Sequence, residues 1–121
     1  MHYLLLIYHS EADWAKMADV DREPIYREYR QLREQLSGTG KYIAGSQLMP
    51  TGMATTVRVR DGKRVVTDGP FAETKEQLGG YFFIDASGLD EAIAVAGRIP
   101  AAREGSIEIR PLVFMQRANQ A

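Results

Sequence analysis

The sequence predicts an α+β domain in which one antiparallel sheet carries two helices on a single face. Two short segments, 3–8 and 81–84, are apolar at every position, as in strands that are covered on both faces. Two longer segments, 22–36 and 89–99, repeat apolar residues at helical spacing. The alternation of these segments along the chain predicts helices that pack on a sheet.

The composition is that of an ordinary globular domain. The chain has 121 residues, of which 45% are hydrophobic and 26% charged, so we expect one domain over residues 1–121 with one compact core. The absence of cysteine excludes disulfides, thiolate nucleophiles and cysteine-bound zinc or iron–sulfur centres. The formal net charge of -1, without a run of like charges, argues against nucleic acid as a partner.

Several other function classes lack support in the sequence. A metal site needs three or four ligands, and His2 and His9 without cysteine supply no such set. The chain has neither a G-x-G-x-x-G nor a Walker motif, so no nucleotide cofactor is expected. The apolar run 3–8 is far shorter than the roughly 20 residues that span a bilayer, and no signal-peptide pattern surrounds it. We therefore expect a cytoplasmic protein without a membrane partner.

The first half of the chain begins with a strand over 3–8 and a short helical turn. Ser10 and Asp13 have the spacing of a helix cap, and this turn can bury Trp14. A longer helix is predicted to start at a cap formed by Asp21, to hold Pro24 in its first turn and to end near Leu36, before the glycine-containing cluster 37–40. Its apolar face consists of Ile25, Tyr29, Leu32 and Leu36.

A β-hairpin is predicted in the middle of the chain. A second strand begins at Tyr42 and is interrupted at 50–52. The segment 55–60 then alternates like a half-exposed strand, and Asp61-Gly62 is the signature of a type I′ turn that returns the chain through 63–67.

The last third is expected to hold a strand at 81–84, a helix and a final strand. Ser87 and Asp90 again have capping spacing, and Pro111 in the last strand, 106–114, fits best at a sheet edge or bulge. The tail after Met115 is expected to fray. The apolar helix face is predicted to consist of Leu89, Ala92, Ile93, Ala96 and Ile99.

This order of elements is the ferredoxin-like split β-α-β arrangement, with a hairpin inserted and both helices on one face of the sheet. The opposite face then has no helix, although strands 3–8 and 81–84 are apolar on both sides. A second copy of the chain is the simplest cover, which predicts a homodimer. The alternative is a cleft roofed by the hairpin and loop of the same chain.

One long segment resembles a known family signature. The residues VTDGPFAETKEQLGGY at 66–81 resemble the signature of the DGPF branch of the YCII-related family. The resemblance continues through 54–58, 98–102 and 109–111, so it covers nearly the whole chain. It implies a subunit of a dimeric α+β barrel. It also implies a bacterial protein of unassigned activity, often encoded near extracytoplasmic-function sigma factors.

The resemblance also bears on catalysis. Relatives of the YCII type carry a histidine and an aspartate that are proposed as an acid/base pair, with the histidine on the first helix. In this chain the segment 22–36 has no histidine and offers Tyr26 and Tyr29 instead. The family pair therefore cannot be transferred residue by residue.

Two residues are candidates for acid/base chemistry. Asp68 precedes Gly69 and Pro70, a combination that is first of all typical of a turn. At the end of a hairpin strand over an apolar cleft, it could also act as a general base or ligand anchor. His9 ends the first strand, where it either makes one backbone contact or serves a site.

The candidate binding residues are charged side chains near the same segment. Glu73, Lys75 and Glu76 place three charges just before an apolar strand, either as a solvated loop or as a site at the barrel mouth. Arg58 on the hairpin is either a cross-strand partner of an acid such as Glu108 or an anion clamp.

Two functions remain open at this point. The first is a small-molecule protein that uses a cleft near the loop at 68–77, either as an acid/base lyase or isomerase or as a non-catalytic binder. The second is an interaction or regulatory module that serves an extracytoplasmic-function sigma factor, which predicts an exposed apolar patch beyond the homodimer contact.

Overall fold

A computed structural model describes residues 1–114 of the chain. The elements are β1 (His2–His9), α1 (Glu11–Lys16), α2 (Asp19–Gly38), β2 (Tyr42–Gln47), η1 (Thr51–Met53), β3 (Thr55–Arg60), β4 (Lys63–Asp68), β5 (Gln77–Asp85), α3 (Leu89–Arg98), η2 (Pro100–Arg103) and β6 (Ser106–Pro111).

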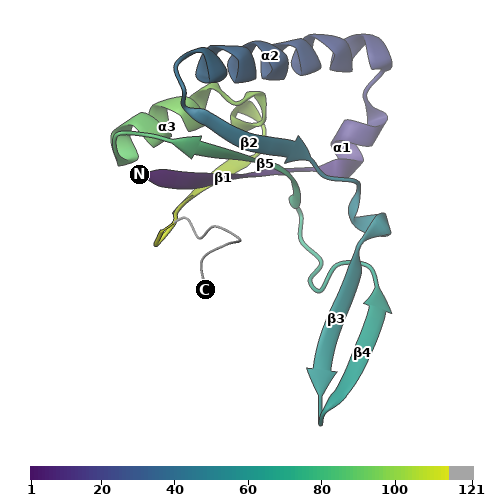
Figure 1. The fold of residues 1–121 in the computed structure, drawn as a ribbon. Helices are drawn as coiled ribbons and strands as arrows, with labels where there is room; N and C mark the ends of the chain where they lie inside the picture. The colour runs from purple at the N-terminus through teal and green to yellow at the C-terminus, as the bar shows by residue number, and fades with distance from the viewer. Residues whose placement is uncertain (115–121) are drawn as a thin grey trace.

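The main sheet has four strands in the order β2-β5-β1-β6, and each neighbouring pair is antiparallel. Helices α2 and α3 lie on one side of this sheet (Figure 1). The arrangement is α+β and compatible with the predicted ferredoxin-like order. Strands β3 and β4 form a separate two-stranded hairpin that projects away from the rest of the chain (Figure 1). In the described part of the chain, no helix is long and apolar enough to cross a membrane.

The two central strands present alternate side chains to opposite faces, as their sequence predicted. Leu5 pairs with Phe82 in the register and both are buried on the helix side. Their neighbours Leu6 and Tyr81 also pair, but on the side without helices, where they are only half-buried. We call this side the open sheet face; its apolar members on β1 and β5 are Leu4, Leu6, Tyr81 and Phe83. The core lies between the sheet and the two helices and consists of Tyr3, Leu5, Ile7, Leu32, Leu36, Phe82, Ile84, Ala86, Ala92, Val95, Ala96 and Ile99.

The helix α2 begins earlier than the sequence predicted. Its first residue is Asp19 and its N-cap is Ala18, so Asp21 lies inside the helix instead of capping it. The prediction that Pro24 lies in the first turn is therefore also wrong. The start is held from outside, because the Arg22 guanidinium donates to the Trp14 carbonyl at 2.9 Å. At the other end, Gly40 adopts a φ of 73° and provides the predicted left-handed exit.

The helix α3 differs from its prediction in its cap and in its buried face. Gly88 is the N-cap residue, and no side chain caps the helix from that position, so the predicted cap by Ser87 is wrong. Instead the Ser87 amide donates to the Glu91 carboxylate at 3.1 Å. Leu89 and Ile93 are more than half exposed, and the buried residues are Ala92, Val95 and Ala96. The buried side of α3 is therefore rotated away from Leu89 and Ile93, toward Ala92 and Ala96. These small side chains let the helix approach the sheet closely.

The strand boundaries also differ in two places. Strand β5 starts at Gln77, four residues before the predicted start, because its first residues pair with the end of β1. Strand β6 ends at Pro111 and lies at the sheet edge, where a residue without an amide hydrogen is tolerated. The predicted hairpin is confirmed, since Asp61 and Gly62 have φ values of 52° and 73°. The predicted fraying after Met115 lies outside the described residues.

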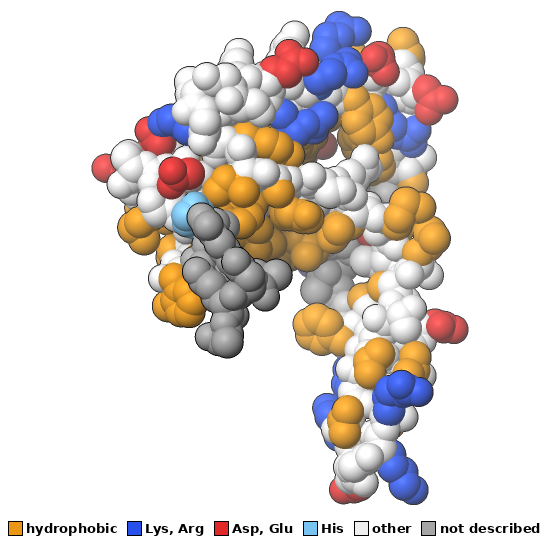
Figure 2. All heavy atoms as spheres, viewed as in Figure 1, with side chains coloured by type: hydrophobic (Ala, Val, Ile, Leu, Met, Phe, Trp, Pro, Cys, Tyr) orange, Lys and Arg blue, Asp and Glu red, His pale blue; other side chains and the backbone are white. Residues whose placement is uncertain are grey.

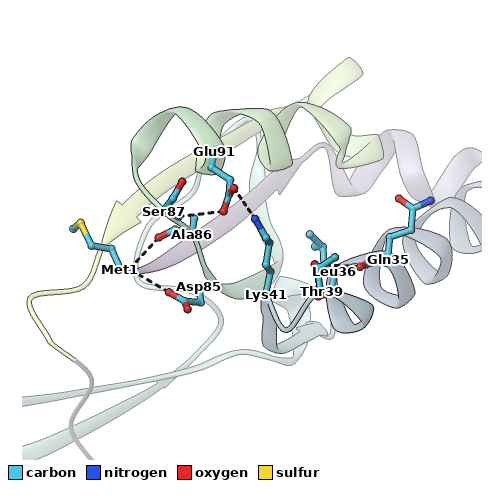
Figure 3. Close-up of polar contacts among 9 residues, drawn as sticks. All are labelled: Met1, Gln35, Leu36, Thr39, Lys41, Asp85, Ala86, Ser87 and Glu91. Atoms are coloured by element: carbon cyan, nitrogen blue, oxygen red, sulfur yellow. Dashed lines mark hydrogen bonds and ion pairs between the residues drawn. The ribbon is translucent and has the colours of Figure 1, made fainter.

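Polar contacts join the helices to one end of the sheet (Figure 3). Lys41, which follows α2, lies 2.6 Å from the Glu91 carboxylate on α3. The Lys41 ammonium lowers the pKa of the Glu91 carboxyl from its ordinary value of 4.5, and the Ser87 amide adds to this effect. The Met1 amine lies 3.1 Å from Asp85 and lowers the pKa of that carboxyl from 3.8. Both carboxyls therefore favour the charged form in the folded state.

These shifts predict acid destabilisation. A carboxyl whose pKa is lower in the folded state contributes stability above its unfolded pKa, and this contribution is lost as the pH falls through the folded pKa. We expect the free energy of unfolding to decrease below about pH 4.5, the ordinary value for Glu91. The Lys41→Met variant should show a shallower decrease in urea unfolding series, whereas Lys63→Met at the hairpin should match the wild type. An unchanged slope for Lys41→Met would contradict this prediction.

Candidate functional site

A pocket of about 430 Å³ lies on the helix side of the sheet. It is bounded by α2, by the residues around η2 and by the ends of β1, β2 and β5. The buried apolar part of its wall includes Ile7, Phe82 and Pro100. The half-buried polar side chains on the lining include His9, Tyr29 and Arg33. The pocket thus combines an apolar interior with a few polar side chains, as small-molecule sites do.

His9 enters the pocket because of a local irregularity in the sheet. The register of β1 against β5 shifts between Ile7 and Tyr8, so Gly79 has no partner on β1. The His9 imidazole packs directly over Gly79, and a Cβ atom at that position would collide with the ring. A glycine is therefore required for this placement of the histidine.

Aromatic side chains form one wall of the pocket. The Trp14 ring lies edge-on to the His9 imidazole at 6.0 Å and to the Tyr26 ring at 5.6 Å. The Arg22 guanidinium lies 5.6 Å from the centre of the Trp14 ring. Arg22 also donates to the Trp14 backbone carbonyl, so it contacts both the ring and the main chain of this residue. This wall is consequently positioned before any ligand arrives.

The cations around the pocket differ in how they are engaged. Arg103 makes a two-pronged contact with the Glu28 carboxylate at 2.8 and 3.1 Å, which lowers the pKa of that carboxyl. For Arg33, by contrast, no ion pair is present within residues 1–114. The two carboxylates on the pocket lining, Glu23 and Glu104, are exposed at the rim. Arg30 also lines the pocket, but it is exposed. The lining therefore includes His9 and a half-buried arginine that has no ion pair within residues 1–114.

Tyr29 separates the pocket from the core. Its ring packs edge-on to Phe82 at 6.2 Å, and its phenol also lines the pocket. Burial raises the pKa of this phenol from its ordinary value of 10.0, although the Ala101 amide and Arg103 act in the opposite direction. Tyr29 therefore remains a neutral hydrogen-bonding group at neutral pH.

The sequence-predicted site residues lie in different parts of the structure. Only His9 lines the pocket. Asp68, at the end of β4, is exposed on the projecting hairpin, and Arg58, on β3 of the same hairpin, is half-buried. Glu73 and Lys75 are exposed in the loop before β5, and Glu76 accepts a hydrogen bond from Ser106 at 2.9 Å. Within one chain, none of these residues lines the pocket together with His9.

Sequence reasoning noted Tyr26 and Tyr29 on this helix but missed Arg33, which lines the same pocket as His9. Tyr26, Tyr29 and Arg33 lie on one side of the helix at spacings of three and four. The pattern was visible, but arginines on a helix are ordinarily solvated, and nothing in the sequence showed that the end of β1 lies beneath them.

The fold and this pocket define a small α+β protein with a partly polar, aromatic-walled cavity under its longest helix. The model of the YCII-related domain matches residues 1–116 of the chain. An uncharacterized protein of Rhizobium meliloti (strain 1021) is 38% identical over 116 residues, which cover 94% of each chain. The chain belongs to the YCII-related family.

Proposed function

We propose that this protein binds a small organic acid in the pocket beneath α2. The observation that carries the proposal is the half-buried Arg33, which has no ion pair within residues 1–114 and which lines the same cavity of about 430 Å³ as His9. A guanidinium matches a carboxylate in shape and charge. The aromatic wall of Trp14 and Tyr26 would then contact the apolar part of the ligand.

His9 gives this binding site a group that can exchange protons. Histidine is the side chain best suited to donate and accept a proton near neutral pH. A ligand whose carboxylate binds Arg33 shares the pocket with the imidazole, because both side chains line it. A lyase or isomerase step would use His9 to remove a proton from the bound acid or to return one, whereas a pure binder would use it as a hydrogen-bond donor.

The test compares two arginines on the same helix. Thermal-shift titration of the wild type against a panel of small carboxylic acids should identify ligands that raise the melting temperature. For the best of these, Arg33→Gln should weaken binding about ten- to a hundredfold, the usual range for losing a charged hydrogen bond. Arg27→Gln, an exposed position outside the pocket lining, should bind like the wild type.

The same ligands distinguish catalysis from binding. Proton NMR of each stabilising acid with the protein would report turnover or exchange of a carbon-bound hydrogen, and His9→Gln should abolish either signal. Stabilisation without any turnover would leave a non-catalytic binder. If no carboxylic acid binds, or if Arg33→Gln and Arg27→Gln weaken binding equally, the proposed site is wrong.

We further propose that the functional unit is a homodimer, in which a second copy covers the open sheet face. The support is physical: Leu4, Leu6 and Phe83 lie on a sheet side that no described helix covers. Removing apolar surface from water is worth about 25 cal/mol for each Å², so this face favours association. Figure 2 shows hydrophobic side chains gathered on the body between the hairpin and the grey tail residues.

A further inference from the structure

The β3–β4 hairpin has two chemically different faces. Val57 pairs with Val66, and Val59 pairs with Arg64, so these side chains share one face of the ribbon. We call this side the valine face; it holds Val57, Val59 and Val66 in its middle, with Arg64 opposite Val59, and Thr55 and Asp68 at its base. The other side, which we call the cationic face, carries Arg58, Arg60, Lys63 and Val65. Hydrophobic and basic side chains accordingly occur side by side on the hairpin in Figure 2.

The valine face has no cover within the described part of the chain. Val57, Val59 and Val66 are 57%, 63% and 55% exposed. A two-stranded hairpin by itself is at best marginally stable in water, and apolar side chains on both of its strands need a surface to pack against. The exposed valines therefore indicate that the hairpin is an arm that packs against a surface outside its own two strands.

Hydrogen bonds hold the segment that leads into the arm to the body. The Leu48 amide donates to the Gly79 carbonyl at 2.9 Å, and the Glu11 carboxylate accepts from both the amide and the hydroxyl of Thr51, at 2.9 and 2.7 Å. The two ends of the arm are joined to each other, because the Gly69 amide donates to the Ala54 carbonyl at 2.7 Å. The arm projects away from the body in Figure 1, so its valine face is not packed on its own sheet.

The net charge of the arm favours a negatively charged partner surface. Residues 55–68 carry four cations and two carboxylates, a net charge of +2. The whole chain has a formal charge of -1, which leaves -3 for the remainder. A second copy of the same chain therefore offers a body of opposite charge and an uncovered apolar face, both of which suit this arm.

We propose that the arm of each protomer docks by its valine face on the body of the partner, beside the partner's open sheet face. This proposal rests on the proposed homodimer and assigns the arm a role in it. The contact is reciprocal, since a two-fold axis places both arms equivalently. It extends the sheet contact with a second apolar surface that neither copy can cover alone.

The first test is cross-linking between labelled and unlabelled chains. Because the chain has no cysteine, Val59→Cys supplies one attachment point for a benzophenone photo-crosslinker. In a mixture of ¹⁵N-labelled and unlabelled protein, cross-links from position 59 should join chains of different isotope composition. Arg58→Cys, on the cationic face of the same strand, should give far fewer. Cross-links confined to one chain would overturn the proposal, as would cross-linking in a cell lysate to another protein, such as a sigma factor, and not to a second copy.

The second test uses two matched substitutions on the full chain. Val59→Lys places a charge on the valine face, and Val65→Lys places the same charge on the cationic face. We expect Val59→Lys to raise the dimer dissociation constant at least about tenfold in sedimentation equilibrium, and Val65→Lys to change it less than about threefold. Circular dichroism confirms that both variants fold.

The outcomes separate this inference from the proposed homodimer. A wild type that sediments as a monomer at micromolar concentration overturns both. A stable wild-type dimer with equal dissociation constants for Val59→Lys and Val65→Lys overturns the role of the arm alone. A selective effect of Val59→Lys with cross-links between chains supports it.

Discussion

Leu5→Ala is expected to lower the free energy of unfolding by about 2 to 5 kcal/mol, the range for truncating a fully buried leucine. The Leu5 side chain is 0% exposed, in a central strand between Phe82 on β5 and Ile109 on β6. The surrounding sheet and helices cannot collapse into the space that its methyl groups leave. Urea unfolding monitored by circular dichroism, at one protein concentration for all variants, measures the change.

Leu89→Ala is the matched control for this prediction. Leu89 is 54% exposed at the start of α3, so its truncation should change stability by no more than about 0.5 kcal/mol. Equal losses for the two leucines would mean that the buried side of the sheet has been assigned incorrectly.

Leu6→Glu, at the very next position, is expected to abolish dimerisation while leaving the chain folded. Leu6 lies on the open sheet face, opposite Tyr81 on β5 and Glu108 on β6. A carboxylate there would be buried without a partner in the proposed interface and close to a second acid. The free energy of its desolvation and of the repulsion would exceed the free energy that the dimer contact provides. Sedimentation equilibrium should show the wild type at twice the 13.6 kDa chain mass and the variant at 13.6 kDa.

Val20→Glu controls for the added charge in this experiment. Val20 is 76% exposed on α2, away from the open sheet face, and its substitution should leave the dimer intact. A Leu6→Glu protein that still dimerises would show that the open sheet face is not the interface. A wild type of 13.6 kDa would mean that no second copy covers this face at micromolar concentration.

The elements that the sequence predicted best are those with strong local signals. A type I′ turn requires a positive φ at both central residues and therefore favours Asp-Gly, as at Asp61 and Gly62. This signal depends only on residues that are adjacent in the chain. The opposite faces of Leu5 and Leu6 follow from the two-residue period of a strand. Of the helix caps, the one predicted at Ser10 is confirmed, since its hydroxyl accepts from the Asp13 amide at 3.2 Å. The caps of α2 and α3 were predicted wrongly, because Ala18 and Gly88 begin these helices without a side-chain cap and leave no signature.

The candidate site was predicted less well than these elements. His9 was a candidate because it ends a strand, but nothing in the neighbouring sequence indicated that Arg33 would line the same pocket. Asp68 and His9 were candidates for one cleft. Within one chain, Asp68 does not line the pocket that His9 lines, because β4 belongs to the hairpin that projects away from the body.

The sequence by itself determined the α+β class, the order of the elements, the hairpin and the two-sided apolar character of the central strands, since each depends on periodicity or turn chemistry within a few residues. The tertiary structure alone decided where the pocket lies. Its walls come from β1, α2, β5 and η2, which are distant along the chain, and the placement of His9 in it accompanies a register shift at Gly79. The tertiary structure also decided that the valines of the hairpin are exposed, because burial depends on which surfaces of the folded body lie within reach.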